Sequence, residues 1–489
     1  MAHNATNGGS QTAMRESDAV IVPPISGNAE EGKDGTQVEL VQGTHFLYTG
    51  KGVKMVTKLD RIGEMSASNP KMVFTSLYHM INEDLLRECH REMDGKKAPG
   101  VDKVTKAEYE ANLGENLTDL VARLKRKSYK PQPSLRVYIP KDNKGNLRPL
   151  GMAAYEDKLV QSALGKVLMA IYEPKFHDSM YGFRPKRGCH DALKELNRLI
   201  EKGKTNFIVD ADIKSFFNNI DHERALELIK FRINDPNILW LVKKTLTAGV
   251  MEDGKWQPID KGTEQGNLAS PVIANIYMHY ALALWYEVKL KNTFRGESGL
   301  VIYADDFVAT FQYKDDAARF LEAVKERFAT FGLELAPDKT RLLEFGRYAE
   351  QNRKNRNEGQ PETFDFLGFT HYCSKGMKPG WFKLGRKTAK KKQRKKLTEM
   401  NLWIKQNRHL RLKDLIGMLN SKLRGHYQYY GVTGNSGCIA DFLFETQKML
   451  FKWLNRRSQR KSYNWVGFND LLKLFPLARP KIYVKLFDS

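Results

Sequence analysis

The chain has 489 residues, a length that corresponds to about three or four structural units and allows more than one hydrophobic core. Lys and Arg number 80 against 57 Asp and Glu, and the resulting net charge of +23 favours a polyanionic partner such as nucleic acid. A hydrophobic fraction of 41% excludes wholesale disorder. Charges such as Lys166 interrupt the apolar runs, which excludes membrane spans.

The N-terminal residues and the cysteines indicate where the protein works. Residues 1–64 are expected to be an acidic, polar, disordered tail and linker, because Gly, Ser, Asn and Thr dominate the first 45 residues. The first 20 residues carry no basic stretch followed by an apolar core, which argues against a secretory signal. The four cysteines form no CxxC pair, so neither a local zinc site nor a disulfide framework is encoded. We expect a cytoplasmic protein.

The segment from residue 65 to 204 is predicted to be mainly helical with one β-hairpin. Apolar residues recur at helical spacing over 65–130 and end in a basic run, which predicts a helical lead-in with a cationic face. Turn-forming residues at 142–145 separate two β-prone arms over 136–150, so a hairpin carrying Lys141 and Arg148 is expected. A helical stretch follows over 156–204, broken near Arg184 and Pro185.

The centre of the chain alternates strands and helices. Alternating apolar residues over 207–213 predict a half-buried strand whose polar face carries Asp210 and Asp212. Ser270 is expected to cap a helix that Pro271 opens. Two apolar arms over 300–311, joined by an acidic turn, predict a second hairpin.

A helix over 317–331, stopped by Gly332, and a strand ending at Phe345 complete this part. Strand, helix, hairpin, helix and strand predict an α+β fold, with an antiparallel sheet backed by helices.

The C-terminal residues 385–489 are expected to form a separate, strongly basic helical domain. Eight of the twelve residues from 386 to 397 are Lys or Arg. Such a run is often only a solvated helix face, but in a chain of +23 it favours phosphate contacts and salt-sensitive binding.

Two neighbouring carboxylates are the sharpest chemical feature of the sequence. Asp305 and Asp306 follow one another at the predicted hairpin tip, where they repel each other unless a cation or solvent screens them. An ordinary Asp-rich turn is the alternative. Asp212, on the polar face of another strand, favours convergence of these carboxylates on divalent metal. Two Mg²⁺ ions roughly 3.5–4 Å apart can support in-line phosphoryl transfer.

Several motifs occur together in a fixed order along the chain. They are Arg148-Pro149-Leu150-Gly151, the run 157–161, Tyr181-Gly182-Phe183-Arg184-Pro185, Asp212 with Phe217, Gln265-Gly266 with Ser270-Pro271, Tyr303-Ala304-Asp305-Asp306, Gly332 with Lys339, and Phe366-Leu367-Gly368-Phe369. The later members resemble the palm motifs of reverse transcriptases. The earlier ones are similar to the fingers of bacterial group II intron reverse transcriptase/maturases, and the resemblance extends from about Met65 to the C-terminus.

The resemblance implies a right-hand polymerase in a bacterial cytoplasm. It assigns residues 65–205 to the fingers with an N-terminal helical extension, 206–384 to the palm and 385–489 to the thumb or maturase-like domain. It makes Asp212 and Asp305 the ligands of two Mg²⁺ ions, with Asp306 in support and Mn²⁺ as a substitute metal. A solvated turn residue is the alternative for Asp306.

The resemblance also implies residues that bind the incoming deoxynucleotide. Lys141 and Arg148 would neutralise its triphosphate, and Phe217 would exclude a sugar 2′-hydroxyl. Gln265 would pack near the nascent base pair, and Lys339 would lie near the triphosphate. A core aromatic is the alternative for Phe217, and a solvated lysine is the alternative for Lys339.

The remaining implied contacts are to the nucleic acid itself. Gly266 would allow a close approach of the backbone. Phe366, Leu367 and Gly368 match the primer-grip turn, with apolar packing as an alternative. In the thumb-like helix over 416–430, the resemblance implies contacts from Arg424, Tyr427 and Tyr430, although aromatic residues at helical spacing are more often core.

Two departures from the family pattern bear on template pairing. The chain reads Gly151-Met152-Ala153-Ala154 where relatives commonly have Gly-Ile-Pro-Thr, and Gln265-Gly266-Asn267-Leu268-Ala269 where many have a second glycine or small residue and a β-branched pair. No Cys/His cluster resembles an HNH endonuclease, so cleavage of a target strand is not expected.

The sequence thus predicts an RNA-directed DNA polymerase that extends a primer 3′-hydroxyl with deoxynucleotides on an RNA template, and that also binds, and assists the splicing of, a group II intron RNA. One alternative is a domesticated relative serving phage defence, CRISPR adaptation or DNA repair. Another is a splicing factor without catalysis, which retention of the three carboxylates argues against. An RNA-templated RNA polymerase is the third, which Phe217 disfavours.

Overall fold

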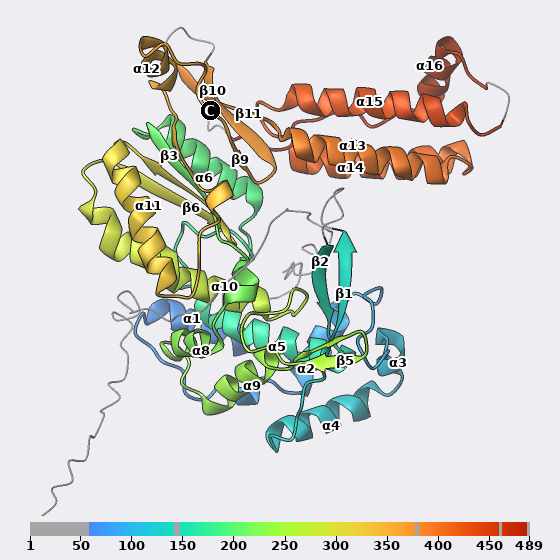
Figure 1. Ribbon diagram of the computed structural model, residues 1–489. Coiled ribbons are helices and arrows are strands. Elements are labelled where there is room, and N and C mark those ends of the chain that lie inside the picture. Colours follow the sequence, from blue (N-terminus) through green and yellow to red (C-terminus); the bar gives the residue numbers. More distant parts are fainter. Residues whose placement is uncertain (1–57, 141–146, 377–380, 459–461, 487–489) are drawn as a thin grey trace, which may run out of the picture.

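The computed structural model describes residues 58–140, 147–376, 381–458 and 462–486. Its N-terminal part is mainly helical and contains α1 (Lys58–Ser68), η2 (Tyr78–Met80), α2 (Glu83–Glu92), α3 (Lys106–Ala111), α4 (Leu113–Lys125), α5 (Tyr155–Tyr172) and α6 (Cys189–Glu201). The side chains of Asn82 and Thr105 cap α2 and α3, as short polar residues do at helix starts. Figure 1 shows α5 inside this helical part, and nearly all of its residues are buried.

The start of α1 corrects one expectation. Residues 58–64, predicted as part of a disordered tail, begin a helix that packs along α5, where the Ser66 hydroxyl donates to the carbonyl oxygen of Ile171 over 2.7 Å. The rest of the predicted tail, residues 1–57, lies outside the described residues.

The predicted hairpin over 136–150 is present. Strand β1 (Ser134–Pro140) pairs antiparallel with β2 (Leu147–Met152), and it also pairs in parallel with β4 (Val250–Glu252). Strand β5 (Lys255–Gln257) completes a sheet of order β2-β1-β4-β5. The turn of this hairpin, including Lys141, lies outside the described residues.

The central sheet is antiparallel throughout, as the α+β prediction requires. Its strands are β3 (Phe207–Asp212), β6 (Ser298–Tyr303), β7 (Asp306–Phe311) and β8 (Arg341–Glu344), in the order β6-β7-β3-β8. The helices in this part of the chain are α7 (Phe216–Asn219), α8 (His222–Lys230), α9 (Pro236–Leu246), α10 (Ser270–Met278), η3 (His279–Ala283), η4 (Tyr286–Leu290), η5 (Lys291–Thr293), α11 (Lys314–Ala329), η6 (Pro337–Lys339) and α12 (Ala349–Asn355).

Helices cover both faces of this sheet. Phe320 and Phe328 of α11 belong to the same core cluster as Val209 of β3. Leu196 of α6 shares the second core cluster with Ile208, the next residue along the strand. Strand β3 is therefore buried on both faces rather than half-exposed, because α6, the helix that directly precedes it in the chain, folds back over the face that the alternation assigned to solvent.

The helix predicted to open at Pro271, with Ser270 as its cap, begins one residue earlier. Ala269 is the N-cap and Ser270 is the first helical residue of α10, because the Ser270 hydroxyl turns toward the carbonyl oxygen of Glu264 instead of capping the helix. The helix continues through two π-helical turns, η3 and η4. Gly332, predicted to stop α11, has φ 66, a left-handed value that favours glycine.

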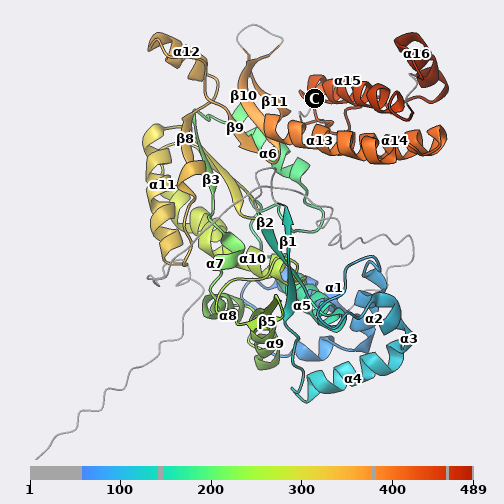
Figure 2. The ribbon, with the colours of Figure 1, turned by 45° about the vertical axis from the view of Figure 1, so that its right-hand side comes forward.

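A third sheet joins the central sheet to a helical arm. Strands β9 (Phe364–Phe366), β10 (Phe369–Lys375) and β11 (Phe382–Thr388) lie in the order β11-β10-β9, and the arm consists of α13 (Lys390–Asn407), α14 (Leu412–Tyr430), α15 (Ser436–Leu454) and α16 (Trp465–Leu474). Figures 1 and 2 show the arm extending away from the sheets. The boundary expected between residues 384 and 385 falls inside β11.

None of the helices in the described parts of the chain is both long and apolar enough to cross a membrane.

A buried carboxyl in α5 makes stability depend on pH. Asp157 is 3% exposed and accepts hydrogen bonds from the Tyr129 hydroxyl and from the Gln132 N–H at 2.9 Å. Burial raises the pKa of Asp157 from 3.8 to about 6. The folded protein therefore retains a proton that the unfolded chain releases, and the free energy of unfolding falls as the pH rises from about 4 to about 6.

Asp157→Asn keeps one of the two acceptor oxygens but does not titrate, so we expect it to remove up to about 3 kcal/mol of this pH dependence. Denaturant unfolding at a series of pH values measures the difference, with the exposed Asp441→Asn as control. Parallel curves for the wild type and Asp157→Asn would contradict the expectation.

Candidate active site

The pairing of β3 with β7 brings the predicted carboxylates to one end of the central sheet. Asp212, the last residue of β3, lies directly opposite Asp306, the first residue of β7. Asp305 occupies the turn between β6 and β7, next to Ala304, which has φ 58. Directly opposed residues of an antiparallel pair point to the same face with Cβ atoms roughly 4.5–5.5 Å apart, so these carboxylates share one small region.

A lysine already stands beside the most buried of these carboxylates. The Lys339 Nζ lies 3.1 Å from the Asp212 Oδ2, and the two side chains are 40% and 6% exposed. The pair forms because the backbone carbonyl of Asp212 accepts the Ala336 N–H at 2.8 Å, which brings the short helix η6 next to the end of β3. The resemblance implied a position for Lys339 near a triphosphate, whereas in the structure Lys339 forms an ion pair with the Asp212 carboxylate.

The carboxylate oxygens of Asp212, Asp305 and Asp306 suit a divalent cation, although the described residues do not form a complete metal site. Carboxylate oxygens are the ligands that Mg²⁺ prefers, and the Lys339 ammonium shows that Asp212 accommodates a positive charge. Among the described residues, no three His, Cys, Asp or Glu side chains are arranged so that together they could hold a metal ion. Asp212, Asp305 and Asp306 are therefore candidate ligands rather than a preformed cluster.

The aromatic residue predicted to contact the sugar follows β3 in the short helix α7. Ser215 has φ 48, and this left-handed residue turns the chain sharply into α7. Phe216 then enters the core at 1% exposure, whereas Phe217 is half-buried. The carbonyl oxygen of Phe217 accepts the Thr263 N–H at 2.7 Å, which fixes α7 against the segment leading to Gln265.

Gln265 and Arg148, far apart in sequence, contact each other directly. The Arg148 guanidinium Nε donates to the Gln265 Oε1. The Gly151 N–H donates to the Gln265 carbonyl oxygen over 2.8 Å, so β2 and this loop are joined by backbone as well. Gly266 has φ 122, and a Cβ there would lie 2.2 Å from the Gly151 carbonyl oxygen, so glycine is required for this approach.

The segment 179–184 supports the turn that carries Asp305. The Tyr181 N–H donates to the Ile302 carbonyl oxygen at 2.9 Å, and the Ile302 N–H donates to the Ser179 carbonyl oxygen at 2.7 Å. The segment therefore runs beside β6. The backbone at Gly182 passes so close to Ala304 that a Cβ would lie 2.4 Å from the Ala304 nitrogen.

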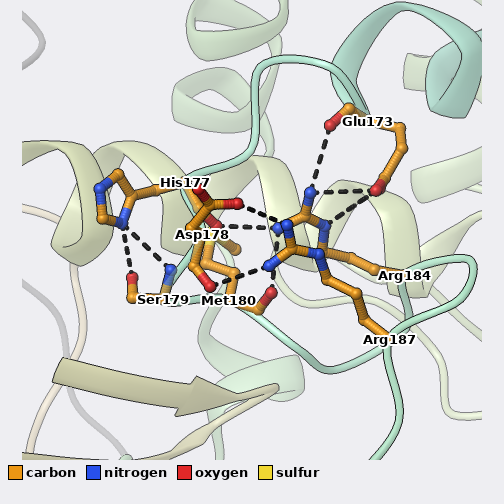
Figure 3. Close-up of polar contacts among 7 residues, drawn as sticks. All are labelled: Glu173, His177, Asp178, Ser179, Met180, Arg184 and Arg187. Atoms are coloured by element: carbon orange, nitrogen blue, oxygen red, sulfur yellow. Dashed lines mark hydrogen bonds and ion pairs between the residues drawn. The ribbon is translucent and has the colours of Figure 1, made fainter. Parts of the chain in front are cut away.

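Arg184 anchors this segment, as Figure 3 shows. Its guanidinium donates to the Glu173 carboxylate at 3.0 Å and to the carbonyl oxygens of His177 and Met180 at 2.8 and 2.9 Å. Arg184 is only 8% exposed, and a buried guanidinium with several acceptors holds the surrounding backbone in a fixed shape. This basic residue has a structural role that the motif alone did not reveal.

The predicted primer-grip turn packs against α14. Phe366 is 2% exposed, while Leu367 and Gly368 both have positive φ values, 48 and 78. The Tyr429 hydroxyl donates to the Leu367 carbonyl oxygen at 2.9 Å. Tyr429, to which the sequence assigned no role, therefore helps to join the turn to the arm.

The three residues of α14 implied to contact nucleic acid differ in exposure. Arg424 is exposed. Tyr427 and Tyr430 are 0% and 7% exposed, and the Tyr427 hydroxyl donates to the Ala478 carbonyl oxygen at 3.2 Å. Both tyrosines pack in the core of the arm, so the alternative considered for them holds and they do not present a contact surface.

The basic run predicted to contact phosphates begins α13 and borders an open pocket. The pocket has a volume of about 350 Å³ and is lined by Lys390, Gln393, Arg394, Leu397, Thr398, Asn401 and Met449. Lys390 and Arg394 are exposed, so positive charge faces the solvent at this pocket.

Two family models match the chain in succession. Residues 139–371 match the family described as reverse transcriptase (RNA-dependent DNA polymerase), and residues 390–468 match the group II intron maturase-specific domain. The first match contains β3, the β6–β7 hairpin and the Gln265 loop, and the second contains α13, α14 and α15.

Curated relatives point the same way. The chain is 36% identical over 234 residues to the group II intron-encoded protein LtrA of Lactococcus lactis subsp. cremoris, which covers 48% of this chain and 39% of that protein. It is 33% identical over 226 residues to protein YkfC of Escherichia coli, covering 45% of this chain and 59% of YkfC. The matched segments thus span less than two thirds of these relatives. The chain thus contains a region that matches the reverse transcriptase family, followed by one that matches the group II intron maturase-specific domain, and these matches confirm the resemblance to group II intron reverse transcriptase/maturases that its sequence predicts.

Proposed function

We propose that the protein is an RNA-directed DNA polymerase that extends a primer 3′-hydroxyl with deoxynucleotides on an RNA template. The observation that carries the proposal is the register that sets Asp212 opposite Asp306, with Asp305 in the adjoining turn, inside the region matched to reverse transcriptases. Divalent metal bound by these carboxylates would supply charge neutralisation and an activated primer hydroxyl.

We assign a separate role in polymerisation to each of the three parts of the chain. The helical part over 65–205 serves as the fingers, the central part over 206–384 as the palm and residues 385–489 as the thumb. Arg148 and Gln265, which contact each other, line the nucleotide side, and Phe217 excludes the 2′-hydroxyl. Lys339, which contacts Asp212, would release that carboxylate to a metal ion and neutralise the triphosphate instead, and Gly266 and the 366–368 turn hold the template and primer backbones.

Group II intron RNA is the proposed second ligand. The maturase-specific match over 390–468 supports this, and so does LtrA, whose name describes it as intron-encoded. The exposed basic side chains of α13 would contact RNA phosphates.

Primer extension on poly(rA)/oligo(dT) with dTTP and Mg²⁺ tests the polymerase. We expect Asp305→Asn to lower the extension rate about a hundredfold or more, because the amide cannot neutralise a cation, while RNA affinity persists. Asp315→Asn, a matched change at an exposed position of α11, is the control. Tight RNA binding by a folded wild type that extends no primer would favour a splicing factor without catalysis and contradict the proposal.

The contact between Lys339 and Asp212 predicts competition with metal. Lys339→Gln removes a positive charge 3.1 Å from the Asp212 Oδ2, so we expect Mn²⁺ to bind roughly two- to tenfold more tightly. Titration of free Mn²⁺ by electron paramagnetic resonance, without nucleotide or primer, measures this. The control is Lys325→Gln, because Lys325 pairs with Glu322 on α11. Unchanged or weaker Mn²⁺ binding in Lys339→Gln would argue against competition.

The basic pocket of α13 predicts a salt-dependent contact. The Lys390→Gln, Arg394→Gln variant loses two exposed cations, so we expect its RNA affinity to vary less steeply with salt, with a slope smaller by about 1.4 to 1.8. Binding isotherms at several salt concentrations measure the slope. An identical slope in the wild type and the variant would remove this pocket from the RNA-binding surface.

A further inference from the structure

Phe183 connects the turn that carries Asp305 with the aromatic residue that follows β3. Its ring meets the ring of Phe217 edge to face, with centroids 6.2 Å apart and 82° between the ring planes. Phe217 also contacts Phe216, at 5.4 Å and 64°, and Phe216 belongs to the core. The ring of Phe217 therefore touches one ring of the core and one ring from a separate segment, and edge-to-face pairs of this kind favour a defined geometry.

The backbone around Phe183 is held from several directions. The Asn275 side-chain amide donates to the Gly182 carbonyl oxygen at 2.8 Å, and Gly182 packs on Ala304. On the other side, Arg184 is anchored by Glu173 and by two carbonyl oxygens (Figure 3). The residues on both sides of Phe183 are therefore fixed by contacts to several different elements.

Phe183 itself adopts a strained conformation. Its φ is 55, a left-handed value that is unusual for a bulky residue. Such strain persists where the surroundings fix the backbone, and it is concentrated at sites where a side chain must be held in one place. The anchoring of Gly182 and Arg184 is the structural cause here, and its result is the placement of the Phe183 ring against Phe217.

We infer that Phe183 is a positioning residue for sugar selection, because its ring holds Phe217 in the orientation that leaves no room for a nucleotide 2′-hydroxyl. The inference rests on the proposed function, since sugar selection at Phe217 requires that this site bind an incoming nucleotide. It adds a determinant of the choice between deoxynucleotides and ribonucleotides that acts through Phe217 and is carried by the 179–184 segment.

Single-nucleotide insertion opposite a template uridine tests the inference, with dATP and ATP as substrates that differ only in the 2′-hydroxyl. The comparison uses the wild type, Phe183→Ala, Phe217→Ala and the double variant. We expect Phe183→Ala to lower the ratio of kcat/KM for dATP to that for ATP roughly three- to tenfold. The double variant should be no less selective than Phe217→Ala alone, because Phe183 acts through Phe217.

Two controls separate positioning from general loss of packing. Phe183→Tyr keeps the ring contact and should retain the wild-type selectivity. Phe294→Ala removes a comparable half-buried ring, which meets Phe311 edge to face at 5.3 Å and 85°, and should leave selectivity unchanged. Full selectivity in Phe183→Ala, or a further loss in the double variant relative to Phe217→Ala, would overturn the inference.

Unfolding of the same four proteins provides a readout that does not need activity. A non-additive loss of stability in the double variant supports the contact, and strict additivity overturns it. If the wild type inserts neither nucleotide, the proposed function fails. The unfolding comparison then still tests whether the rings of Phe183 and Phe217 stabilise each other.

Discussion

The antiparallel register between β3 and β7 is the constraint on which the candidate site depends. It pairs Asp212 with Asp306, and a slip of one residue would send every side chain of β3 to the opposite face. Both faces of β3 are buried, so the two core clusters on either side fix the register strongly. The acidic end of the sheet is therefore held by the packing of Ile208 and Val209 as much as by any contact of its own.

Local patterns in the sequence were sufficient for most of the elements. The hairpins over 136–150 and 300–311 and the helix ended by Gly332 follow from turn residues and periodicity, which act over a few residues. The burial of Ile208 was not predictable in this way, because alternation within the strand does not indicate that the preceding helix α6 folds back over this face. The same applies to Ser270, whose hydroxyl bonds back to Glu264 and leaves Ala269 as the cap.

The candidate site was predictable as a set of residue types but not as a set of contacts. Motif order identified Asp212, Asp305 and Phe217, whereas the pairing of Arg148 with Gln265 depends on loops that meet only in three dimensions. Helical spacing alone could not show whether Tyr427 faces the solvent or the core, because aromatic residues occur at such spacing in both places. Its side chain is buried, and its hydroxyl donates to the carbonyl oxygen of Ala478, far along the chain. Nothing in the sequence around Tyr429 indicated that its hydroxyl binds the carbonyl oxygen of Leu367.

The close approach of Gly151 and Gly266 has a consequence for protein engineering. A side chain at residue 266 would strike the backbone carbonyl oxygen of Gly151, and one at residue 151 would have to displace the Glu264 carboxylate, which lies 2.4 Å from where its Cβ would be. Libraries that diversify β2 and the Gln265 loop separately will mostly produce steric clashes. A redesign therefore has to exchange these two segments together. The two glycines thus mark a boundary at which segments from related proteins can be recombined only together.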